Sequence, residues 1–71
     1  MAMSVADYDR LERAIVDGRR LSFWRRGTEY IVIPERLRIA DRREVVMARH
    51  PSTGHKLELF VDEIDAIEAV Q

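Results

Sequence analysis

The sequence predicts an α+β domain that is mainly β, with an N-terminal helix followed by a small barrel of five strands. Residues 4–18 carry helix boundary signals and an apolar repeat of helical period. From Leu21 onward, apolar and polar residues mostly alternate, and turn sequences separate the alternating runs. The 71 residues are enough for one domain, which we take as residues 1–71.

The helix prediction depends on its two ends and on one stripe. Ser4 and Asp7 have the spacing of a capping box, in which each side chain bonds the other residue's free amide. Gly18 supplies the left-handed residue with which many helices end. The apolar stripe between them consists of Tyr8, Leu11, Ala14 and Ile15. We therefore expect a surface helix that packs on the sheet.

The stretch from Leu21 to Ile39 predicts a hairpin of two apolar runs joined at residues 25–28. The two-residue period of a strand places Leu21 and Phe23 on one face, which we expect to be the core, and Trp24 on the other. Pro34 cannot donate a ladder hydrogen bond, so the return strand must bend or run as an edge there.

The remaining chain predicts three more strands. Residues 44–49 and 56–61 form two runs, separated by the turn sequence Pro51-Ser52-Thr53-Gly54. In the tail, apolar residues recur every three positions from Val61 to Val70, which fits a helix about as well as a strand. We predict a short turn at residues 62–63 and then a last strand, because a small sheet needs closure to hide its edges. This order suits an Sm-like or SH3-like barrel.

Charge is unevenly distributed, although the net charge is only −1. Residues 10–56 hold all 12 basic residues against six acids, whereas residues 57–71 hold five acids and no base. Such asymmetry favours an anionic ligand, a basic partner protein or head-to-tail homo-oligomers. The chain has no cysteine and no apolar run of about 20 residues. We expect a soluble cytoplasmic protein without a membrane partner.

The sequence does not predict an enzyme, a cofactor or a metal site. Asp62, Glu63 and Asp65 are acidic, but no nucleophile, glycine-rich loop or ordered triad accompanies them. His50 and His55 bracket a turn and could begin a zinc site, yet no third ligand is close in sequence. We interpret them as exposed hairpin histidines.

The candidate binding residues are one aromatic and four arginines. Trp24 shares its strand face with Arg20 and Arg26, so it could stack a base while the arginines hold phosphates. Arg36 and Arg38 project from one face about 6.5 Å apart, close to the spacing of phosphates along a strand. The alternative is structural: Trp24 covers the barrel, and the two later arginines pair with acids across the sheet.

Several of these residues resemble the WYL domain, an Sm-like module of bacterial transcription regulators. The features are Gly18-Arg19-Arg20, Leu21-Ser22-Phe23-Trp24, Pro34 with Leu37, Met47-Ala48 before Gly54, and Phe60 with Asp62 and Ile64. The resemblance implies binding of single-stranded nucleic acid or a nucleotide-like ligand in a basic groove. Tyr30 and Glu63 stand where that family has arginines of its ligand face.

A second stretch, residues 7–12 (Asp-Tyr-Asp-Arg-Leu-Glu), is similar to the helix of the Rof family. These are small Sm-like proteins that bind the termination factor Rho. This resemblance implies an antiterminator in which Tyr8, Asp9 and Glu12 face Rho.

Overall fold

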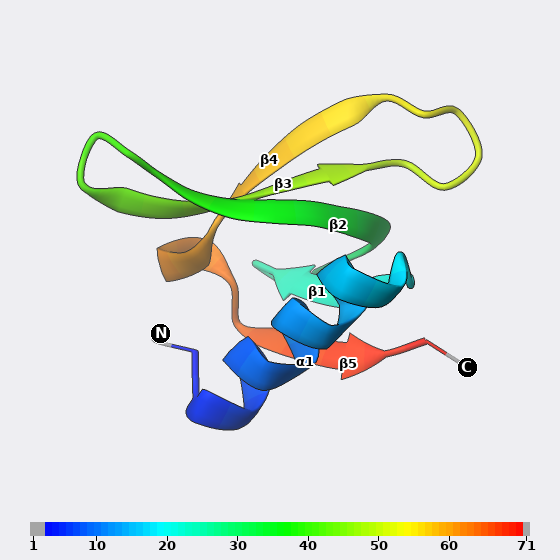
Figure 1. Ribbon diagram of the computed structural model, residues 1–71. Helices are drawn as coiled ribbons and strands as arrows, with labels where there is room; N and C mark the ends of the chain where they lie inside the picture. Colours follow the sequence, from blue (N-terminus) through cyan, green and yellow to red (C-terminus); the bar gives the residue numbers. More distant parts are fainter. Residues whose placement is uncertain (1–2, 71) are drawn as a thin grey trace.

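The computed structural model describes residues 3–70, and it has one helix followed by five strands (Figure 1). The elements are α1 (Val5–Asp17), β1 (Leu21–Arg25), β2 (Thr28–Ala40), β3 (Arg43–Arg49), β4 (Lys56–Phe60), the 3₁₀ turn η1 (Val61–Glu63) and β5 (Ala66–Ala69). The predicted class, mainly β with an N-terminal helix and five strands, is confirmed. The predicted turn at residues 62–63 and the last strand are confirmed as well.

The strands form one antiparallel sheet in the order β4-β3-β2-β1-β5. β2 belongs to both halves of it, because residues 28–32 pair with β1 and residues 33–40 pair with β3. A bulge between Pro34 and Arg36 bends β2, so the two halves face each other across the core (Figure 1). β4 and β5 are the outer strands of the order and do not pair with each other, so the sheet is not closed into a barrel.

Pro34 produces this bulge rather than ending the strand. The sequence predicts a bend or an edge at the proline, and the bend is confirmed: β2 has its bulge there and continues as a single strand of 13 residues. Because Pro34 has no N–H, the ladder is irregular there without leaving an orphaned donor. Because of the bulge, Arg36 is paired in register with β3, whereas Glu35 has no partner in the β3 register.

The core lies between the two halves of the sheet and under α1. Phe23 is fully buried, and Leu21 is 4% exposed, which confirms the predicted inner face of β1. α1 contributes Leu11 and Ala14 to the same cluster, and Tyr8 and Ile15 pack beside them. Its predicted ends are confirmed too: Ser4 and Asp7 form the capping box, and the C-cap residue Gly18 has φ 66°.

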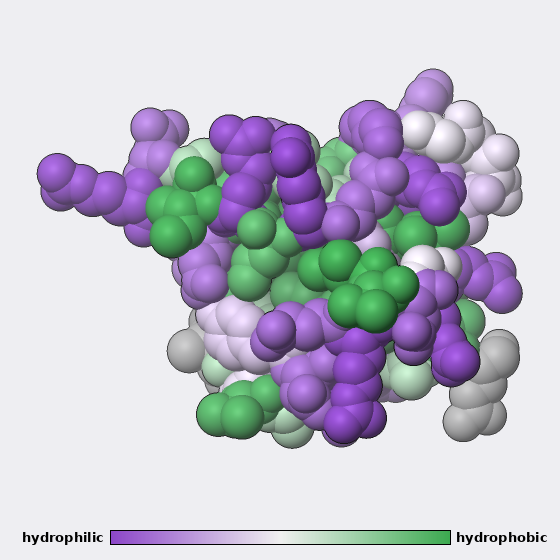
Figure 2. Space-filling model, in the orientation of Figure 1, coloured by the Kyte–Doolittle hydropathy of each residue, from purple (hydrophilic) through white to green (hydrophobic). Residues whose placement is uncertain are grey.

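The outside of the molecule is mainly hydrophilic. On the side that α1 covers, hydrophilic residues surround several smaller hydrophobic groups (Figure 2). The large hydrophobic side chains with most exposure are Val5, Val16, Ile31 and Ile39. Within residues 3–70, no helix is long and apolar enough to cross a bilayer.

Candidate functional site

The outer face of β2, β3 and β4 carries two of the predicted arginines. Residues that stand opposite each other in a sheet point to the same side, so the register defines this face. Arg36 stands opposite Met47, and Arg38 stands opposite Val45. The next strand places Glu58 in the first row and Phe60 in the second. We call this set the β2–β4 outer face: Arg36, Arg38, Arg43, Val45, Met47, Glu58 and Phe60.

Ion pairing separates the basic side chains into two groups. Of the 12 lysines and arginines, seven form ion pairs with carboxylates. Among residues 3–70, five have no such partner: Arg20, Arg26, Arg36, Arg38 and Arg42. All five are exposed. All four predicted binding arginines are therefore in the unpaired group. The alternative prediction, in which Arg36 and Arg38 pair with acids across the sheet, is wrong: among the described residues, neither Glu44 nor Glu58 forms an ion pair with them.

Arg43 and Phe60 form a stacked pair at one end of the β2–β4 outer face. The guanidinium carbon lies 3.8 Å from the ring centroid. Two nitrogens of Arg43 bond the carboxylate of Asp62, at 3.0 and 2.7 Å, and Glu63 accepts a further bond at 3.3 Å. The hydrogen bond from Arg43 lowers the pKa of Asp62, and the same bond raises the pKa of Arg43. The arrangement fixes a flat guanidinium on an aromatic ring beside Val45, which is 1% exposed.

The other end of this face carries an ion-pair cluster around the bulge. Glu35 accepts a hydrogen bond from Lys56 at 2.6 Å and pairs with Arg49 at 3.3 Å. The bond from Lys56 lowers the pKa of Glu35. Glu35 offsets only one of these two positive charges, so this end of the face keeps one positive charge in excess. Of the basic residues on this face, Arg36 and Arg38 are the two without a carboxylate partner among the described residues.

Trp24 lies on the outer side of β1, away from the β2–β4 outer face. Its cross-strand neighbours are Glu29 and Ala66, so the register places an acid rather than an arginine beside it. The side chain is half-buried, and its Nε1 is buried without a hydrogen-bond partner among the described residues. Ser22, on the same side of β1, is only 4% exposed. These contacts favour the covering role of Trp24 over a base-stacking role.

The five predicted binding residues do not share one surface. Glu29, opposite Trp24, and Arg36 are roughly 23 Å apart along the bent strand β2. Arg26 lies in the β1–β2 turn with φ 52°, and its backbone N–H bonds Asp65 at 3.0 Å. Arg20 lies in the connection from α1 to β1. The structure therefore brings together Arg36 and Arg38 alone.

The residues predicted for a protein partner lie on α1. Asp9 and Glu12 are exposed, and Asp9 pairs with Arg13 at 3.1 Å. Tyr8 is half-buried and donates a hydrogen bond to Glu44 of β3, which raises the pKa of the Tyr8 phenol. Asp9 and Glu12 are thus available on the surface, whereas the Tyr8 hydroxyl is engaged within the fold.

The His50 side chain stabilises the turn of the β3–β4 connection. His50 Nδ1 accepts hydrogen bonds from the backbone N–H groups of Ser52 and Thr53, at 3.2 and 3.3 Å. Within residues 3–70, no group of three His, Cys, Asp or Glu side chains is arranged to hold a metal ion.

Sequence reasoning did not include Phe60, Arg43 or Met47 in the candidate site. The alternation of residues 56–61 does place Phe60 on the polar side of its strand, which is the one available signal. Its neighbours depend on the register of three strands, and no sequence pattern specifies that Arg38 and Phe60 flank Val45.

Comparison with protein-family models, with curated proteins and with solved structures found no match in any of the three.

Proposed function

We propose that this protein is a non-enzymatic, Sm-like binding module that acts in transcription regulation or RNA metabolism by binding single-stranded nucleic acid. The proposed ligand surface is the β2–β4 outer face. The N-terminal helix, the strand order and the strong bend of β2 support an Sm-like assignment, although the sheet is open between β4 and β5.

One observation carries the proposal: Arg36 and Arg38 are adjacent on one strand face, exposed and without a carboxylate partner among the described residues. Most other basic side chains already pair with acids. A phosphate that binds Arg36 and Arg38 does not have to displace a protein carboxylate, so its full electrostatic attraction is available. Their separation of about 6.5 Å suits two successive phosphates of an extended strand.

The stacked Arg43–Phe60 pair favours a single strand over a duplex. Unstacked bases lie flat on aromatic rings or on guanidinium planes, and both belong to this pair. Asp62 and Glu63 hold the guanidinium in place, so a base meets a platform that is already ordered. A duplex would present phosphates to Arg36 and Arg38 but no base face to the platform.

The test is fluorescence anisotropy of a labelled single-stranded oligonucleotide, measured over a range of salt concentrations. Each phosphate contact to a single strand contributes a slope of about −0.7 to log K against log salt. The double variant Arg36→Gln/Arg38→Gln should weaken binding and make the slope shallower by about 1.4. Arg10→Gln/Arg13→Gln removes the same charge from α1 and is the matched control.

Two results would overturn the proposal. The first is the absence of binding by the unmodified protein at low salt. The second is an equal loss in both double variants, which would mean that net charge alone attracts the oligonucleotide.

A second candidate function is binding to a basic partner protein such as Rho through α1. The observation in its favour is that Asp9 and Glu12 are exposed on one side of the helix. Co-purification with Rho that is lost on Asp9→Lys or Glu12→Lys, combined with a flat oligonucleotide titration, would favour this function over the first.

A further inference from the structure

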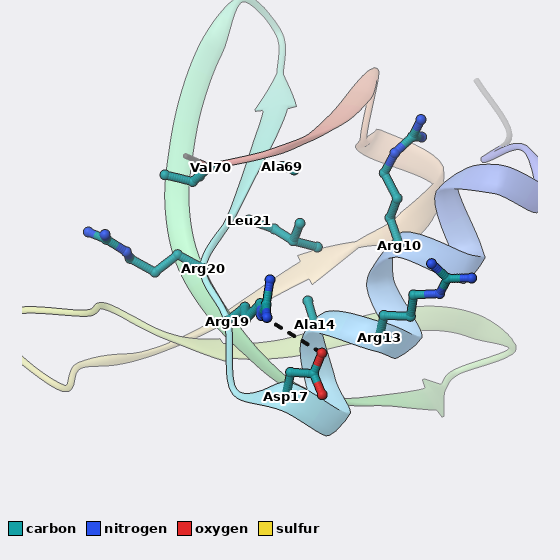
Figure 3. A pocket seen from close by; sticks show the side chains of 9 residues that line it. All are labelled: Arg10, Arg13, Ala14, Asp17, Arg19, Arg20, Leu21, Ala69 and Val70. Atoms are coloured by element: carbon teal, nitrogen blue, oxygen red, sulfur yellow. Dashed lines mark ion pairs between the residues drawn. The ribbon is translucent and has the colours of Figure 1, made fainter.

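A cavity of about 290 Å³ lies between the second half of α1 and the strands β1 and β5, away from the β2–β4 outer face (Figure 3). Four of its residues come from α1, two from the connection to β1, one from β1 and two from β5 and the residue after it. The lining consists of Arg10, Arg13, Ala14, Asp17, Arg19, Arg20, Leu21, Ala69 and Val70.

The uncharged part of the lining is aliphatic. It consists of Ala14, Leu21, Ala69 and Val70, and it contains no aromatic ring, hydroxyl or amide side chain. This part of the lining offers a nucleobase no aromatic ring for stacking and no hydroxyl or amide side chain for hydrogen bonds to its edges. This part of the cavity therefore suits a short alkyl body.

The charged part of the lining is strongly basic. Arg10 and Arg13 extend from α1 on one side, and Arg19 and Arg20 come from the α1–β1 connection (Figure 3). The lining has a single carboxylate, that of Asp17, and two acids outside the lining pair with Arg10 and Arg13, so the four arginines exceed their neighbouring acids by one charge. The excess of positive charge favours an anionic head group, and a guanidinium fork matches a carboxylate.

The existing ion pairs of these arginines are weak competitors. Arg10 and Arg13 pair with acids of α1 at 3.1 Å, and their side chains are 50% and 78% exposed. Arg19 pairs with Asp17 at 3.8 Å and is also 78% exposed. Exposed pairs of this kind contribute about 0–1 kcal/mol, so a ligand carboxylate can replace them at small cost. Arg20 has no carboxylate partner among the described residues.

We propose that this cavity binds a small amphiphilic anion, namely an aliphatic carboxylate of medium chain length. The alkyl chain lies on the aliphatic residues, and the carboxylate lies beside the guanidiniums of Arg10 and Arg13, whereas Arg20 is directed to the opposite side (Figure 3). The volume is at the lower limit of small-molecule sites, which fits a ligand of this size. The site is independent of nucleic-acid binding, because it shares no residue with the β2–β4 outer face.

The experiment is a titration of ¹⁵N-labelled protein with octanoate, followed by the amide chemical shifts. We expect saturable shifts confined to residues of the lining, with Ala14, Leu21 and Ala69 as reporters. Arg10→Gln/Arg13→Gln should raise the Kd by about tenfold or more, since hydrogen bonds to charged groups are strong. Arg36→Gln/Arg38→Gln is the control and should leave the Kd unchanged. The same spectra show whether each variant is folded.

The neutral analogue 1-octanol tests the role of the carboxylate. Weaker binding of octanol than of octanoate supports the site. Equal affinities, shifts that spread over the surface without saturation, or equal losses in the two double variants would each overturn it. These outcomes do not bear on oligonucleotide binding, so the two proposals can fail separately.

Discussion

Replacement of Leu11 by alanine tests whether α1 packs against the open sheet as part of the core. The proposed cavity depends on this packing, because α1 supplies one side of its lining. Leu11 is fully buried and belongs to the core cluster that joins α1 to both halves of the sheet. A buried Leu→Ala change removes transfer free energy and leaves a cavity, at a total of roughly 2–5 kcal/mol. A 71-residue domain has a free energy of unfolding of about 4–11 kcal/mol, so the loss is a large fraction of it.

The assay is urea unfolding followed by far-UV circular dichroism. The midpoint should shift strongly, and thermal unfolding should begin about 10 °C or more earlier, at about 4–8 °C per kcal/mol for a domain of this size. Val16→Ala is the matched control, because Val16 is on the same helix but is 84% exposed. Its effect should stay within about 0.5 kcal/mol.

A loss below about 1 kcal/mol for Leu11→Ala, or a loss equal to that of Val16→Ala, would refute the reasoning. α1 would then not be part of the cooperative core.

Three further predictions concern single contacts. Trp24→Phe should change the free energy of unfolding by less than about 1 kcal/mol in urea titrations. The variant loses packing contacts, but it also loses a buried N–H group, that of Nε1, which has no hydrogen-bond partner among the described residues. A loss above about 3 kcal/mol would contradict this. The pKa of Asp62 is lowered from 3.8 by the bond from Arg43, so this contact stabilises the fold above that pH and is lost as pH falls through the lower folded pKa. Asp62→Asn should therefore show less acid-induced loss of stability than the unmodified protein in pH-dependent unfolding, and an identical pH profile would refute the contact. Gly18→Ala should destabilise the fold by about 1–2 kcal/mol in the same urea assay, because a residue with a Cβ is strained at φ 66°. No atom lies within 4 Å of the added Cβ, so backbone strain is the whole effect, and an unchanged midpoint would contradict it.

Features that depend on neighbouring residues could be predicted from the sequence. The capping box of Ser4 and Asp7, the left-handed Gly18 and the inward direction of Leu21 and Phe23 all follow from local hydrogen bonding or from the two-residue period of a strand. The final strand was open to two interpretations, and the predicted strand is confirmed. The closure of the sheet from which we predicted it is not what the structure has, because β5 pairs with β1 and not with β4.

The candidate site depended on contacts between distant segments, which local patterns do not specify. Parity predicts that Trp24 points away from the core, but its cross-strand neighbours Glu29 and Ala66 come from β2 and β5, and its half-buried state is a property of the assembled sheet. Likewise, the choice of which arginines pair with acids is made by side chains far apart in sequence, such as Arg43 with Asp62.

The sequence by itself determined the helix, the strands and the alternation of their faces, because these depend on interactions over a few residues. Only the tertiary structure decided that β2 continues through the bend at Pro34 and pairs with both β1 and β3, that Arg36 and Arg38 stay unpaired among the described residues, and that β4 and β5 do not pair with each other. The physical reason is that register, ion pairing and edge contacts are set by the packing of whole strands and of α1 against one another.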